Sequence, residues 1–167
     1  MQTASPTRKV ALSGVLVSLA AIFSYVETLV PLGFGVPGIK LGLANVVVVF
    51  ALYSMGVRYA LTINVVRIIV VASLFGSPVI MLYSLSGALL SLLVMVILYY
   101  TNKFSMVGVS MAGGVFHNIG QLLVAAAVVE TFQILYYFPV LLVAGMITGI
   151  IIGIIVTRVS RLVTIKI

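Results

Sequence analysis

Residues 59–75 read YALTINVVRIIVVASLF, an apolar run interrupted near its centre by Arg67. A helix needs about 17 to 25 mainly apolar residues to cross a bilayer. Runs of this kind recur along the chain and predict spans at about 10–30, 39–55, 59–75, 79–100, 106–129 and 135–157. Long continuous runs exclude the strict alternation of a membrane β-barrel. The sequence therefore predicts an all-α integral membrane protein, a single domain of six transmembrane helices over residues 1–167.

The composition agrees with this class and excludes several kinds of chemistry. Of 167 residues, 63% are hydrophobic and 7% are charged, whereas soluble domains carry about 25% charged residues. The chain has no Cys, one His and two acidic residues, both Glu, which is a poor set of metal ligands. It also has no Gly-x-x-x-x-Gly-Lys-[Ser/Thr] loop for ATP. We expect no metal, no cofactor and no ATP hydrolysis by this chain.

The net charge of +7 is explained by topology. Seven of the nine basic residues fall on one side of the predicted spans: Arg8, Lys9, Arg58, Lys103, Arg158, Arg161 and Lys166. Cytoplasmic loops carry the excess of Lys and Arg in membrane proteins. We expect both termini in the cytoplasm of a bacterial cell, with the chain passing repeatedly through the plasma membrane. The partner of these charges is the lipid bilayer, and no nucleic acid is implied.

Polar side chains inside the spans are informative because each costs free energy in a bilayer, at least about 2.5 kcal/mol for an Arg at its centre. Arg67 is the ninth residue of its span, and Asn64 lies on the same helix face. His117 and Gln121 share a face of the fifth span, with Asn118 beside them. These residues predict the floor of a binding site.

Further polar residues lie in the outer half of the predicted bundle. They are Glu27, Asn45 and Tyr83, with Lys40 in the outer loop. Together with the floor residues they predict a substrate pocket that opens outward, with the glycine-rich loop at residues 32–40 as its lid. The alternative left open is structural: Arg67 pairs with Glu27 or with helix-end carbonyls, His117 is packed, and the Asn side chains join helices.

Small residues recur on two predicted helices. The first helix carries Ala11, Gly14, Ser18 and Ala21, and the last carries Gly145, Gly149 and Gly153. Such strips let helices approach closely. They indicate either packing within the bundle or an interface with a partner.

Four motifs resemble one family. They are SYVETLVP at 24–31, PGIKLGLAN at 37–45, NVVR at 64–67 and GVFHNIGQ at 114–121. They are similar to small bacterial membrane proteins called the Gx transporter family, also described as heptaprenyl diphosphate synthase component I. That family in turn resembles the S components of energy-coupling factor transporters, which bind a small molecule near the outer face.

The resemblance implies a six-helix bundle that docks on a transmembrane T component and two cytoplasmic ATPases through a strip on the first helix. Here the strip is Ala11, Gly14, Ser18 and Ala21. Gly14 and Ser18 depart from the Ala-x-x-x-Ala pattern of S components. The leading hypothesis is a non-enzymatic, substrate-binding subunit for uptake of a small anionic or amphipathic compound, isoprenoid- or quinone-related.

The alternative hypothesis is a non-catalytic accessory or scaffold subunit of a prenyl diphosphate or quinone biosynthesis complex. Catalysis by a prenyl diphosphate synthase needs Mg²⁺ held by Asp-rich motifs, and the chain has no Asp. A membrane enzyme acting through His117 and Glu27 lacks a nucleophile, a metal set or paired carboxylates.

Overall fold

The computed structural model describes residues 6–29, 42–130 and 132–163. Within these ranges the chain forms α1 (Pro6–Leu29), α2 (Asn45–Ser54), α3 (Val57–Phe75), α4 (Pro78–Thr101), α5 (Met106–Val129), the 3-10 helix η1 (Phe132–Tyr137) and α6 (Phe138–Leu162). The described residues contain no strand, so the all-α prediction is confirmed. Lys40 and the predicted lid at residues 32–40 lie outside the described residues.

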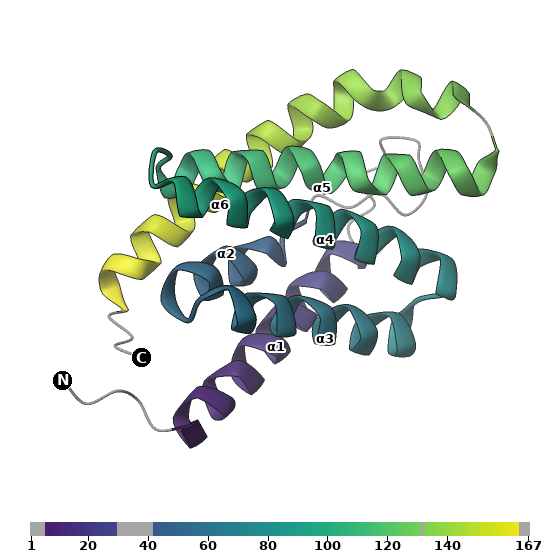
Figure 1. The fold of residues 1–167 in the computed structure, drawn as a ribbon. Helices are drawn as coiled ribbons and strands as arrows, with labels where there is room; N and C mark the ends of the chain where they lie inside the picture. Colours follow the sequence, from purple (N-terminus) through teal and green to yellow (C-terminus); the bar gives the residue numbers. More distant parts are fainter. Residues whose placement is uncertain (1–5, 30–41, 131, 164–167) are drawn as a thin grey trace.

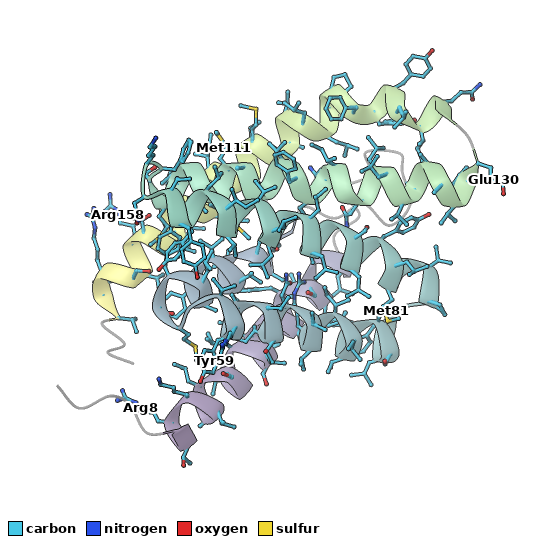
Figure 2. The ribbon with its side chains drawn as sticks, in the orientation of Figure 1. Arg8, Tyr59, Met81, Met111, Glu130 and Arg158 are labelled. Carbon is cyan, nitrogen blue, oxygen red and sulfur yellow. The ribbon has the colours of Figure 1, made fainter. Side chains whose placement is uncertain are left out.

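Five helical segments of the described chain are long and apolar enough to cross a membrane: Thr7–Glu27, Val57–Phe75, Pro78–Thr101, Met106–Val129 and Gln133–Leu162. Figure 1 shows that α1 begins and α6 ends at the same end of the bundle. Arg8 and Arg158 lie at that end in Figure 2, and Glu130 lies at the opposite end. This arrangement supports a multi-pass membrane protein, and the cytoplasmic placement of the termini stays a prediction.

The second predicted span, at 39–55, is described from residue 42 onward and contains a short helix. Its helix α2 begins at Asn45 and has 10 residues, which at 1.5 Å per residue gives about 15 Å, half of a hydrocarbon core of about 30 Å. Val48, Val49 and Leu52 are fully buried, and α2 packs against α1, α3 and α6. Helix α2 is apolar because most of its residues lie in the core of the bundle.

Helices α4, α5 and α6 lie side by side in Figure 1, at very close approach. A Cβ placed on Gly120 of α5 would lie 2.7 Å from the Ser86 carbonyl oxygen of α4. On the other side of α5, a Cβ on Gly149 of α6 would lie 2.6 Å from the Cα of Met111. The backbones therefore touch where side chains are missing. The glycine strip of the last helix serves packing within the bundle.

Alanine substitutions at two glycines, Gly149 of α6 and Gly14 of α1, test this packing. Replacing Gly149 by Ala should destabilise the protein by about 1–3 kcal/mol, because the added methyl group meets backbone atoms of α5. The same change at Gly14 should leave the thermal midpoint in detergent unchanged or slightly raised, since no atom lies within 4 Å of its added Cβ. Equal midpoints for the two variants would contradict the packing account.

Candidate functional site

Arg67 lies at the centre of the candidate site. It is buried in α3, with 5% of its surface exposed. Its Nε and Nη2 groups donate to Asn64 Oδ1 at 3.1 and 2.8 Å, and its Nη1 group donates to Ser24 Oγ at 2.7 Å. These bonds use three of the five guanidinium N–H groups. The guanidinium therefore joins α3 to α1.

Asn64 extends this network to a third helix. It lies one turn before Arg67, so both side chains share a face of α3. Its Nδ2 group donates to the Ala88 carbonyl oxygen of α4 at 3.3 Å. The Asn64 side chain thus uses its oxygen for Arg67 and its nitrogen for α4.

Glu27 brings the segment before α2 into contact with α1. Its buried carboxylate accepts a hydrogen bond from the Gly42 backbone N–H, and it interacts electrostatically with Arg67. Gly42 has φ 79°, in the region that favours glycine. A Cβ there would lie 2.9 Å from Asn45 Nδ2 and 3.5 Å from His117 Cδ2. Gly42 is therefore the meeting point of Glu27, Asn45 and His117.

His117 and Gln121 face α4 at Gly87. A Cβ on Gly87 would lie 3.2 Å from His117 Cε1 and 2.8 Å from Gln121 Cγ. Both side chains are almost fully buried. The missing side chain at Gly87 is what lets the polar face of α5 lie against α4 at this depth.

Together, these contacts form a closed series that begins and ends at α1. Starting from α1, they pass through α3, α4, α5 and the start of α2, and return to α1 at Glu27. We call this set the polar ring, and its members are Ser24, Glu27, Asn45, Asn64, Arg67, His117 and Gln121. Each member is more than nine-tenths buried.

Most of the predicted binding residues are thus brought together. Asn118 lies next to the polar ring on α5 and donates from Nδ2 to the Leu141 carbonyl oxygen of α6 at 2.7 Å. Tyr83 is buried on α4, one turn before Gly87. Ser24 was not predicted, although its position three residues before Glu27 places it on the same helix face. The outward opening of the pocket stays a prediction.

Two amide oxygens beside these contacts have no hydrogen bond in the structure: Asn45 Oδ1 and Asn118 Oδ1. Both atoms are buried, and a buried polar atom normally has a partner. The described residues contain no group of three or more His, Cys, Asp or Glu that could hold a metal. The arrangement is suited to binding through hydrogen bonds and charge.

Comparison with known proteins gives a match to one family. Residues 16–159 match the family model described as heptaprenyl diphosphate synthase component I. The match includes every member of the polar ring, from Ser24 to Gln121, and begins between Gly14 and Ser18 of the α1 strip. No curated protein and no solved structure matches the chain.

The Arg67 network predicts a graded response to mutation. Asn64→Leu should destabilise the protein by at least about 1–3 kcal/mol, since it removes three hydrogen bonds and leaves buried N–H groups of Arg67 unpaired. Ser24→Ala removes one bond and should cost less. Thr62→Ala, on the exposed face of α3, is the control and should change little. Thermal unfolding in detergent measures the order, and a Thr62 effect as large as the Asn64 effect would contradict it.

Proposed function

We propose that this chain, which belongs to the heptaprenyl diphosphate synthase component I family, is a substrate-binding membrane subunit for uptake from the outer face. The ligand is a small anionic or amphipathic organic compound of the isoprenoid or quinone class. The observation that carries this proposal is the polar ring: seven polar side chains from four helices are buried together, and three of these helices, α1, α3 and α5, are long and apolar enough to span a membrane.

The cost of this arrangement supports a binding role. An Arg near the centre of a span costs at least about 2.5 kcal/mol, and polar groups buried without partners add to that cost. A bundle that only needed to pack could fill the same positions with apolar side chains, as α2 does with Val47–Val49. Ionisable residues at membrane depth are therefore taken first as functional.

The partners follow from the resemblance to S components. We propose that α1 docks on a transmembrane T component, which in turn carries two cytoplasmic ATPases, in the plasma membrane of a bacterium. Ala11, Gly14 and Ser18 are exposed on one side of α1, and Ala21 is partly exposed. No atom of the chain lies within 4 Å of a Cβ placed on Gly14. This side of α1 is therefore free for another helix to approach closely.

A second candidate function is favoured by the printed description of the family. Under it the chain is a non-catalytic accessory or scaffold subunit of a prenyl diphosphate or quinone biosynthesis complex. The polar ring would then hold the bundle together, and a small-residue surface would bind a soluble synthase subunit. Under neither candidate is the chain itself an enzyme.

The ligand-binding role is tested at Arg67. Native mass spectrometry of the purified wild-type protein should find a retained small molecule, and Arg67→Gln should reduce its occupancy at least tenfold, because the charge that balances Glu27 and the hydrogen bonds that position Ser24 and Asn64 are lost. Arg58→Gln, exposed at the start of the same helix, is the matched control and should retain the molecule. Unchanged occupancy in a folded, monodisperse Arg67→Gln protein, or no retained molecule in the wild type, would contradict the proposal.

The docking role is tested at Gly14. Gly14→Phe should abolish co-purification of the T component and the ATPases, because the aromatic ring blocks close helix approach, while the thermal midpoint and the retained molecule stay as in the wild type. Leu93→Phe, on an exposed position of α4, should leave co-purification intact. Recovery of a soluble synthase subunit in place of the ATPases would favour the accessory role.

A further inference from the structure

The charges buried in the polar ring are balanced. Among the described residues, the buried side chains that carry a formal charge are Glu27 and Arg67, one negative and one positive. They interact electrostatically with each other. A ligand that brought a negative charge into this ring would leave that charge without compensation from the described residues, and a buried charge without a partner is strongly unfavourable.

The guanidinium is also occupied by the protein. Asn64 Oδ1 accepts from two of its nitrogen atoms, and Ser24 Oγ accepts from the third. A phosphate binds Arg best through two parallel N–H···O bonds. To form them on the Nε and Nη2 side, a phosphate would have to displace Asn64, whose own nitrogen is bound to α4. In this structure the polar ring fixes the position of Arg67, and its Nε and Nη2 groups are not available to a phosphate.

One acceptor in the polar ring, Asn45 Oδ1, lacks a hydrogen-bond donor. Asn45 Oδ1 is a buried acceptor without a hydrogen bond, on a residue that is 4% exposed. Asn45 lies beside Gly42, which is bound to Glu27 and lies close to His117. Asn118 Oδ1 is a second acceptor of this kind, next to His117 in the sequence. An O–H or N–H group of a ligand would satisfy such an oxygen without adding charge.

We infer that the polar ring binds an uncharged amphipathic molecule whose O–H or N–H group donates to Asn45 Oδ1, and that it does not select a phosphate or diphosphate. This inference rests on the proposed function and narrows its ligand. The polar head of the ligand carries the donor. Because Glu27 balances the charge of Arg67, the site selects an uncharged ligand. Asn45 selects a ligand that carries a hydrogen-bond donor.

Three probes with one tail separate the possibilities: farnesol, farnesyl methyl ether and farnesyl diphosphate. Farnesol is neutral with a donor, the ether is neutral without one, and the diphosphate is anionic. Titration into the purified wild-type protein, followed by native mass spectrometry, should give a Kd for farnesol at least tenfold lower than for either other probe. A preference for the diphosphate, equal affinities for all three, or no binding of any probe would overturn the inference.

Two variants show which residues set the selectivity. Glu27→Gln keeps a carbonyl oxygen for the Gly42 N–H and removes the negative charge, so the ratio of diphosphate to farnesol affinity should rise at least tenfold. Asn45→Leu removes the acceptor, so farnesol should bind no better than the ether. A purely structural effect would weaken all probes equally and leave the ratios unchanged, which would overturn the inference. A different result would contradict the proposed function itself: the Arg67→Gln protein would retain the native molecule as the wild type does.

Discussion

A guanidinium group inside a membrane bundle must have its charge and its N–H groups satisfied by protein, and this constraint organises the molecule around Arg67. Its bonds to Ser24 and Asn64 tie α1 to α3, and Asn64 ties α3 to α4. The carboxylate of Glu27 supplies the opposite charge and also holds Gly42 at the start of the next segment. Arg67 and the two residues that satisfy its charge and hydrogen bonds, Glu27 and Asn64, thus connect four segments through polar contacts.

A second constraint acts on the other half of the bundle, where helices approach through glycines. Gly87, Gly120 and Gly149 remove the side chains that would separate α4, α5 and α6. This approach determines where the polar face of α5 can lie, because His117 and Gln121 reach α4 only where Gly87 leaves room. The polar ring therefore forms where the contacts around Arg67, on α1 and α3, meet the helices that approach through glycines, α4 and α5.

Much of this was predictable from sequence. The ends of α3, α4 and α5 agree with the predicted runs within two residues, since lipid-facing helices are continuously apolar. The pairing of Arg67 with Asn64 follows from their spacing of three. The start of α2 at Asn45 was not predicted because a buried core helix and a span are equally apolar, and the positive φ of Gly42 leaves no trace in hydropathy. Ser24 was missed because serines are common in membrane helices, where they bond to their own backbone.

The brevity of α2 bears on how the chain assembles during synthesis. A helix of about 15 Å cannot enter a bilayer as an independent span, and its terminal backbone groups must be covered by protein. One of its neighbours, α6, begins at Phe138, far along the chain from the end of α2 at Ser54. The core around α2 is therefore completed only after α6 has been synthesised, so a nascent chain that lacks α6 leaves part of α2 uncovered.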